Sequence, residues 1–487
     1  MKPFHIFNSL TRAVEPFVSL DTSPTPTVTF YSCGPTVYLP QHLGNMRAYV
    51  FVDTLRRALE FNGYSLRHVM NITDVGHMTS DEDTGEDKIE KTARAEGKSP
   101  LEVANFYIAQ FKRDCAALNI ALPTDAVRDA VAHPPQSALC RATDNIPAMI
   151  GVIERIAAQG YAYTTPSGVY FDVEKWRGPS GMGRLSRQSL GEQHAGQRLE
   201  HSADKRSPHD FALWVLNQPH HMMQWESPWG RGYPGWHIEC SAMSMRYLGE
   251  TIDIHSGGLD HIPVHHENEI AQSESATGHQ FVRYFVHNAF LTGMAGAKIS
   301  KSAGRFPVLD DLVEEKIHPL AFRLLCLGAK YRSELAFSID AVRAAQTNLK
   351  YLYGFMRTVH RGDSDSLWTG EYREKFGDAL NDDLNTAQAL AVVLEMVNRA
   401  YRDSDHLIWN TLREMDTVLG LKLEERLNFL ESKGPLPAEV RPLVDERTTA
   451  RGAKDFKLSD ELRQKITALG WSIKDNPDGT SVYQPEW

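Results

Sequence analysis

Hydrophobic and polar positions near the start of the chain predict a parallel α/β unit. Residues 27–33 are mostly β-branched and aromatic, which is typical of a buried strand, and Gly34 and Pro35 end it. Apolar residues then recur at helical spacing over about 44–62, and a second strand is predicted over about 65–72. Because a strand, a helix and a strand at this spacing form a βαβ unit, we expect a parallel sheet.

The pattern changes between about residues 140 and 235. A helix is predicted over about 144–159, followed by a β-hairpin over 160–173 that turns at Pro166 and Ser167. A segment rich in Gly, Ser, His and charge follows it and predicts a long exposed loop. This region therefore interrupts the parallel α/β pattern.

The α/β pattern resumes and then gives way to helices. Strand-like segments occur at 250–258 and 284–291. After about residue 315 the chain is almost purely helical, with apolar residues at helical spacing in 339–360 and 384–403, which predicts a helical bundle. Gly, Pro and Pro at 434, 435 and 437 mark a linker before a small final domain.

Composition narrows the class of protein. The chain has 487 residues, of which 42% are hydrophobic and 23% charged, so it is an ordinary globular protein of several domains. Its 52 basic and 62 acidic residues give a net charge of −10. A general polyanion binder is therefore excluded, and any contact with nucleic acid must come from local basic patches.

The cysteines and the apolar runs predict a cytoplasmic location. Five cysteines are scattered along the chain with no CxxC pair, which is typical of a reducing compartment and not of a disulfide framework. The first residues lack the apolar core of a signal peptide. No run approaches the ~20 apolar residues of a membrane span, so we expect no membrane contact.

Four residues from distant segments are candidate metal ligands. Cys33 comes just after the first strand, Cys240 lies in GWHIEC, and VHHENE supplies His265 and Glu269. If VHHENE is helical, His265 and Glu269 are four residues apart and share one face. Two sulfurs, one imidazole and one carboxylate would form a four-ligand zinc site. The alternative is that both cysteines are buried apolar residues and the histidine is ordinary.

Familiar catalytic motifs are absent. A zinc hydrolase motif HExxH beginning at His266 would need histidine where Ile270 stands. GMAGAKIS has the wrong glycine spacing for a P-loop, and no GxGxxG follows a strand.

Two other segments point to nucleotide binding. His42-Leu43-Gly44-Asn45 opens the first helix, where free N–H groups and the helix dipole favour phosphate, and Gly44 allows close approach. Much later, Lys298-Ile299-Ser300-Lys301-Ser302 places two lysines on a loop that can neutralise a pyrophosphate leaving group. Each segment alone could be a helix start or a solvated loop. Their occurrence in this order is a stronger signal.

With these residues in place, the sequence resembles the cysteinyl-tRNA synthetases, a branch of the class I aminoacyl-tRNA synthetases. YSCGPTVYLPQHLGNMRAYV resembles the family's first signature and KISKS its second. GWHIECSAMS, DIHSGGLDHIPVHHENEIAQSE and DDLNTAQAL resemble segments specific to the cysteine branch. One departure is Asn45, which stands where the class I HIGH signature ends in histidine. Asparagine still donates a hydrogen bond but carries no charge.

The resemblance implies an α/β fold with a Rossmann-like parallel-sheet catalytic domain. The expected parts are the first half of that domain, a connective insertion, the second half with the KISKS loop, a helical bundle, and a small anticodon-binding domain, over residues 1–139, 140–235, 236–315, 316–433 and 434–487. The insertion is then a connective element and not an editing site.

The resemblance also implies that Cys33, Cys240, His265 and Glu269 bind one Zn²⁺ per chain. Zinc binds thiolates and lowers thiol pKa, so substrate cysteine can ligate it, whereas serine and alanine cannot do so comparably. Losing a metal–sulfur bond discriminates more strongly than the ~1–3 kcal/mol of a missing methylene, so no editing domain is required.

Further roles follow as hypotheses. His42, Asn45 and His237 would contact the ATP phosphates, and Lys298 and Lys301 the departing pyrophosphate; for His237 a structural hydrogen bond is the alternative. The remaining substrate residues would be those that admit adenosine, hold the amino group or wall the pocket: Gly257, Gly258, Asp260, Thr73 and Trp236. For Trp236 a core position is nearly as plausible. Catalysis would be mainly positioning and charge stabilisation.

The end of the chain is expected to bind tRNA. Arg447, Arg451, Lys454 and Lys457 would form one basic stripe on a helix, suited to a phosphate backbone, although many such runs are merely solvated faces. The resemblance places anticodon recognition in this domain, where Tyr483 or Trp487 could stack on a base.

The leading hypothesis is a cysteine–tRNA ligase whose partners are L-cysteine, ATP with Mg²⁺ and cysteine tRNA, acting as a monomer. A second class is an ATP-dependent ligase that joins cysteine to a small aminosugar, as in mycothiol synthesis. Residues 434–487, which such enzymes lack, disfavour it. A third class, an inactive tRNA-binding paralogue, is disfavoured because His42, both loop lysines and all four proposed ligands are present.

Overall fold

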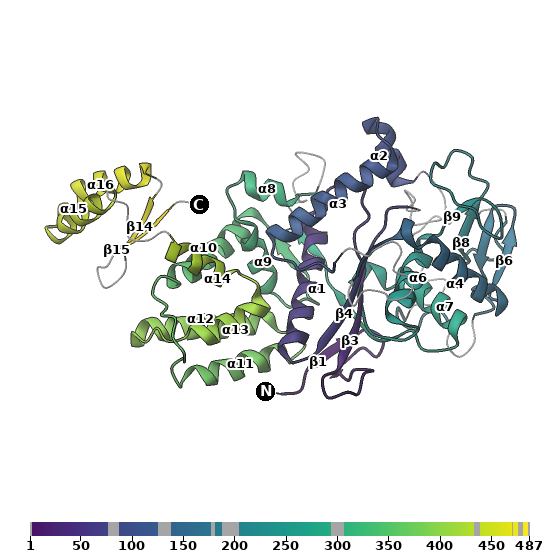
Figure 1. The fold of residues 1–487 in the computed structure, drawn as a ribbon, viewed down its shortest axis with the longest axis horizontal. Coiled ribbons are helices and arrows are strands. Elements are labelled where there is room, and N and C mark those ends of the chain that lie inside the picture. The colour runs from purple at the N-terminus through teal and green to yellow at the C-terminus, as the bar shows by residue number, and fades with distance from the viewer. Residues whose placement is uncertain are drawn as a thin grey trace. The chain divides into compact units, whose positions relative to one another are not determined.

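A computed structural model of the chain describes residues 2–75, 87–124, 138–176, 181–187, 204–293, 306–432, 439–469, 471–475 and 481–485. The chain divides into two compact units, Met1–Leu423 and Glu424–Trp487. Figure 1 shows the elements of each unit. No helix in the described ranges is both long and apolar enough to cross a bilayer.

A five-stranded parallel sheet forms the centre of the first unit. The strand order is β11-β10-β3-β4-β5. Every neighbouring pair is parallel, as the sequence predicts. The strands are β3 (Thr27–Ser32), β4 (Ser65–Ile72), β5 (Ala138–Arg141), β10 (Ile252–Gly258) and β11 (Val282–Asn288). β3 pairs with β4 on one side and with β10 on the other, so the strand order of the sheet reverses direction at β3. Ligands of open α/β sheets bind at the carboxyl ends of the strands at such a point.

Helices cover both faces of this sheet (Figure 1). One group contains α1 (Leu43–Phe61), and the other contains α4 (Ile146–Ala158), α6 (Trp236–Leu248) and α7 (His265–Thr277). Two further helices, α2 (Lys88–Glu96) and α3 (Pro100–Ala117), follow β4, and α3 begins with a capping box between Ser99 and Glu102. The strands are buried on both faces, which explains their continuous apolar runs.

The predicted hairpin is confirmed and belongs to a small antiparallel sheet of order β6-β7-β8-β9. Its strands are β6 (Ala162–Thr165), β7 (Gly168–Phe171), β8 (Phe211–Leu216) and β9 (Gly232–Pro234). Two more two-stranded pairings occur in the first unit, β1 (His5–Asn8) with β2 (Ala13–Pro16) and β12 (Leu291–Gly293) with β13 (Leu335–Phe337). Much of the predicted 176–209 loop lies outside the described residues.

The predicted helical region follows. It contains α8 (Leu309–Glu314), α9 (Pro319–Leu327), α10 (Ile339–Phe355), α11 (Thr369–Leu380), α12 (Thr386–Asp403) and α13 (Trp409–Leu419). Their apolar faces supply buried residues such as Leu349 and Val393.

A buried ion network joins α1 to this helical region. The Asp53 carboxylate of α1 accepts from Arg56 Nη2 at 3.0 Å and Arg57 Nε at 2.7 Å. Arg323 of α9, which is fully buried, brings Nη2 to 2.7 Å from the same carboxylate. Its Nε also donates to the carbonyl oxygen of Leu419 at the end of α13. One carboxylate and three guanidiniums therefore tie three helices together.

The second unit contains all of α14 (Leu423–Ser432) except its first residue, followed by α15 (Arg441–Gly452), α16 (Phe456–Ala468) and an antiparallel pair, β14 (Trp471–Asp475) with β15 (Ser481–Pro485). Val440, Val444, Ile466 and Ile473 form its small apolar core. The predicted boundary at 434 falls among residues 433–438, outside the described residues.

Candidate metal centre

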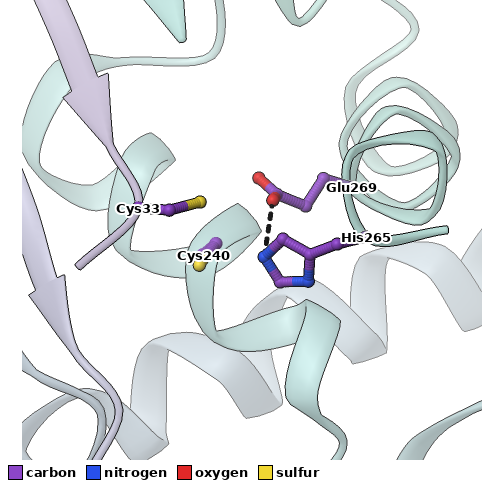
Figure 2. A group of neighbouring side chains, drawn as sticks. All are labelled: Cys33, Cys240, His265 and Glu269. Carbon is purple, nitrogen blue, oxygen red and sulfur yellow. Dashed lines mark ion pairs between the residues drawn. The ribbon is translucent and has the colours of Figure 1, made fainter. Parts of the chain in front are cut away.

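Four side chains from three distant segments meet at the carboxyl end of β3. One donor atom from each of Cys33, Cys240, His265 and Glu269 lies within 4.8 Å of the others. Figure 2 shows the four side chains pointing toward a common space, with Cys33 just past β3, Cys240 on α6 and the other two on α7. This is the set of candidate ligands predicted from the sequence.

The helical spacing predicted for α7 is confirmed. His265 is its first residue and Glu269 lies one turn later, so both side chains project from one face. His265 Nε2 lies 3.0 Å from Glu269 Oε1. Both residues are almost fully buried.

The electrostatics of the cluster favour anionic donors. A hydrogen bond from Cys33, together with the contact with His265, lowers the pKa of the Cys240 thiol to about 6 against the opposing effects of burial and of Glu269. Burial acts to raise the pKa of Glu269, but the imidazoles of His255 and His265 outweigh it and hold that pKa far below its usual range.

The donor set fits a zinc ion. Glu269 Oε1 is buried and has no hydrogen-bond partner among the described residues, although it lies within the cluster. Two thiols, an imidazole and a carboxylate are donors that tetrahedral zinc takes. The thiols and the imidazole select against hard cations such as Mg²⁺.

A second layer of histidines surrounds the four donors. His255 Nε2 lies 2.8 Å from Glu269 Oε2, and His237 Nδ1 lies 2.9 Å from His265 Nδ1. A second possible donor set shares two of these residues. One donor atom from each of Cys33, His255, His266 and Glu269 also lies within 4.8 Å of the others. Sequence reasoning missed His255. The available signal was a histidine inside a buried strand, β10.

Trp236, which was expected to form a wall of the substrate pocket, lies against the donor cluster. Trp236 is half-buried, and its ring stacks on that of His265 with centroids 4.4 Å apart and planes at 27°. His237 is buried, and its Nδ1 faces His265 in the cluster. Its contact with the ATP phosphates stays a prediction.

Thr73 lies at the end of β4 in a hydrogen-bonded group. Its hydroxyl donates to Glu239 Oε2 at 3.0 Å and accepts from Asn71 Nδ2 at 3.1 Å. Glu239 is fully buried beside Cys240 on α6, and sequence reasoning did not single it out. Its other oxygen has no hydrogen-bond partner among the described residues.

The start of α1 has a defined hydrogen-bond arrangement. His42 is the N-cap, and its Nδ1 accepts from the backbone N–H of Asn45 at 3.2 Å. Because Nδ1 accepts, the proton is on Nε2, which makes Nε2 a donor. Burial lowers the pKa of His42, opposed by Asp260, so the neutral imidazole is favoured. The Asn45 amide donates to Gln41 Oε1 at 2.9 Å.

The two glycines that end β10 pack tightly against neighbouring side chains. A Cβ on Gly257 would lie 2.5 Å from His261 Nδ1, and one on Gly258 would lie 2.2 Å from Asp260 Oδ1. Asp260 itself is exposed. Lys298 and Lys301 lie outside the described residues.

The prediction of one basic helical stripe in the second unit is wrong. α15 ends at Gly452, Lys454 has a φ of +61°, and Lys457 lies in α16. Asp455 starts that new helix by accepting from the backbone N–H of Leu458.

The four basic residues also differ in exposure. Arg447 is only 1% exposed, so its guanidinium is not a surface cation. Arg451 is half-buried, and Lys454 and Lys457 are exposed. Of the two aromatic candidates, Trp487 lies outside the described residues and Tyr483 is described only in its backbone pairing with Ile473.

Known proteins resemble the chain over nearly its whole length. A family model for the class I (C) tRNA synthetase catalytic domain matches residues 20–347, and a DALR domain model matches residues 375–424. The chain is 43% identical to cysteine–tRNA ligase 1 of Burkholderia lata, covering 99% of this chain and 97% of the relative. It is 42% identical to the cysteine–tRNA ligase of Treponema denticola, covering 93% and 94%.

The chain belongs to the cysteine–tRNA ligase family. The catalytic-domain match contains all four donors of the candidate metal centre. The predicted fold class is confirmed by this membership and by the parallel sheet.

Solved structures of more distant class I enzymes share the fold of this cysteine–tRNA ligase family member. Methionyl-tRNA synthetase of Mycobacterium tuberculosis has a TM-score of 0.55 at 15% identity, covering 83% of this chain and 90% of that one. A leucyl-tRNA synthetase complex from Agrobacterium radiobacter has a TM-score of 0.55 at 12% identity, covering 86% of each. These likenesses concern the fold alone.

Proposed function

We propose that the chain is a cysteine–tRNA ligase that activates L-cysteine with ATP and transfers it from cysteinyl-adenylate to the 3′ end of cysteine tRNA. The observation that carries the proposal is the convergence of two thiols, an imidazole and a carboxylate at the carboxyl end of β3. Family membership supports the reaction class, and the donor chemistry supports cysteine as the amino acid.

Cys33, Cys240, His265 and Glu269 would hold one zinc ion, which when bound supplies affinity for a substrate thiolate that serine and alanine cannot match. Trp236 closes one side by stacking on His265. Thr73 is oriented by Glu239, which leaves its hydroxyl oxygen suited to receive the substrate amino group.

Activation is an attack of the cysteine carboxylate on the α-phosphorus of ATP, in which the new P–O bond forms and the bond to pyrophosphate breaks. His42 Nε2–H donates to a phosphate oxygen, because its Nδ1 is already engaged by the backbone of Asn45. The N-terminus of α1 adds its dipole. Mg²⁺ would accompany ATP, and Lys298 and Lys301 would neutralise the leaving pyrophosphate. Catalysis rests on positioning and charge.

The second unit would serve tRNA binding. Lys454, in the turn between α15 and α16, and Lys457, in the first turn of α16, are exposed cations close enough in sequence to contact neighbouring phosphates. We propose that the enzyme acts as a monomer in the cytoplasm, and the five free thiols agree with a reducing compartment.

The aminosugar ligase is not favoured. The ligases of Burkholderia lata and Treponema denticola match 99% and 93% of this chain over 97% and 94% of their own length.

The decisive experiment is charging of bulk tRNA with labelled cysteine, with labelled serine as the control. We expect cysteine to enter the tRNA fraction and serine not to do so. Cysteine-dependent pyrophosphate exchange without any tRNA charging would instead favour the aminosugar ligase, and absence of both would indicate an inactive paralogue.

A further inference from the structure

His255 occupies an unusual place for a histidine. It lies in the middle of β10, in the core of the parallel sheet, and it is fully buried. Its ring stacks on Phe285, with centroids 5.5 Å apart, and meets Tyr31 edge-on at 5.1 Å. Such a position usually carries an apolar residue.

The polar contacts of His255 are directed at one residue. Its Nε2 lies 2.8 Å from Glu269 Oε2, whereas its Nδ1 is buried with no hydrogen-bond partner in the described part of the chain. A buried nitrogen without a partner costs stability. Packing alone therefore does not explain why a histidine occupies this position. Its contact with Glu269 does.

That contact determines how Glu269 presents its oxygens. With Oε2 held by an N–H donor from β10, Oε1 is left 3.0 Å from His265 Nε2 and lacks a hydrogen-bond partner among the described residues. A carboxylate free of such a donor would rotate and exchange its two oxygens. Outer-layer hydrogen bonds of this kind fix the orientation of ligands at metal sites.

We propose that His255 is a positioning residue that orients Glu269, so that one carboxylate oxygen is presented to the metal; this inference rests on the proposed function. His255 is thereby separate from the four ligands and acts only through one of them.

The geometry disfavours His255 as a ligand, although it belongs to the second donor set. A ligating histidine normally has a partner for its other ring nitrogen. His265 has one, because its Nδ1 lies 2.9 Å from that of His237, and His266 Nδ1 lies 2.8 Å from His287 Nε2. The Nδ1 of His255 has none among the described residues.

Three substitutions in the full chain test this role. The amide nitrogen of Gln in His255→Gln takes the place of Nε2 and keeps a donor for Glu269. The amide of Asn in His255→Asn takes the place of Nδ1 and cannot reach that carboxylate. His255→Phe keeps the aromatic packing against Tyr31 and Phe285 and removes both nitrogens, so it replaces the Asn variant if that one does not fold.

The primary measurement is zinc affinity by competition with a chromophoric chelator. We expect His255→Asn and His255→Phe to weaken zinc binding about 10–100-fold, and His255→Gln to retain most of the affinity. The absorption of the Co²⁺-substituted protein gives a second readout. Its thiolate-to-metal bands should persist in all three variants, because Cys33 and Cys240 remain bound.

Two results would overturn the proposal. Wild-type affinity in the Asn and Phe variants would make His255 a bystander, and equal loss of metal in the Gln variant and in Cys240→Ser would make it a ligand. A wild-type protein that binds no zinc would refute the metal centre of the proposed function itself, which is a distinguishable failure.

Discussion

Two buried polar clusters lie in the first unit, and they differ in how their charges are balanced. Around Asp53, one carboxylate meets the guanidiniums of Arg56, Arg57 and Arg323, so the protein supplies its own counter-ions. Around Glu269, thiols and a carboxylate gather with imidazoles, and one carboxylate oxygen has no hydrogen bond among the described residues. A closed ion network is typical of structural stabilisation, whereas an open donor set is typical of a site that binds a cation from solution.

The largest expected effect is at the open cluster. Cys240→Ser removes one sulfur donor, so we expect zinc affinity to fall by more than the ~10–100-fold loss typical of outer-layer changes, and the purified protein to lose its zinc. Cysteine-dependent pyrophosphate exchange should be lost with it, while the unfolding free energy of the metal-free protein changes little. Elemental analysis measures the zinc content, exchange assays measure the activity, and denaturant unfolding measures the free energy of unfolding.

Cys140→Ser is the matched control, because Cys140 is a buried thiol in the same core and bonds the carbonyl oxygen of Met70. It should keep its zinc. Full zinc content in Cys240→Ser would contradict the proposed ligand set. It would instead assign the metal to the second donor set, which contains His255 and His266.

The closed cluster should respond in the opposite way. Asp53→Asn leaves the buried Arg323 without its carboxylate, so we expect a loss of about 3–5 kcal/mol in unfolding free energy with zinc content unchanged. Denaturant unfolding measures the loss, and Asp340→Asn, at an exposed site in the first turn of α10, is the control, with an expected cost within ~1 kcal/mol. Loss of zinc in Asp53→Asn with the fold intact would break the distinction between the clusters.

The pH dependence follows from the same carboxylate. Burial acts to raise the pKa of Asp53, but Arg323 and Arg57 outweigh it and lower this pKa to about 2. An unfolded aspartate titrates at about 3.9. The stabilisation is therefore complete above about pH 4 and is lost as the pH falls toward 2. The stability difference between wild type and Asp53→Asn should shrink over that window, and a constant difference would contradict the assignment.

The helix α1 is linked to both kinds of site. Asp53 belongs to its structural ion network, and His42 caps the end at which ATP is proposed to bind. His42→Asn keeps an N-cap side chain but removes the Nε2 donor, so we expect stability to remain near wild type while pyrophosphate exchange falls about 10²–10³-fold. Exchange kinetics and denaturant unfolding measure the two quantities. If both fell together, His42 would act as a cap only.

The smallest expected effect lies outside both clusters. Lys454→Ala with Lys457→Ala removes two exposed cations of the second unit, so tRNA charging should weaken several-fold and its salt dependence should become shallower by about two units of slope. Pyrophosphate exchange should not change. Replacing two exposed lysines of the first unit, Lys330 and Lys350, is the charge-matched control. Equal effects of the two double variants would remove the special role of this turn.

Local patterns predicted much of the fold. β3, α1 and β4 were predicted within a residue or two, because apolar spacing and the break at Gly34 are local signals. The same is true of the pair His265 and Glu269, whose shared face follows from helical spacing alone.

Properties that depend on distant elements were not predictable in this way. The partners of His255 come from α7, β11 and β3, so its contact with Glu269 depends on packing between separate segments. The basic stripe failed for a different reason. Helical spacing was extended through Gly452 and Asp455, although glycine near a helix end and aspartate at a cap are both stop-and-start signals.

The wide separation of the two cysteine donors also bears on how the enzyme is made. Cys33 emerges from the ribosome about 200 residues before Cys240 and well before α7. Throughout that interval the nascent chain carries the Cys33 thiol without any of the other three candidate donors. Under the proposed function, the zinc ion would therefore bind late in synthesis, after the small antiparallel sheet has been completed and the two halves of the parallel sheet have joined.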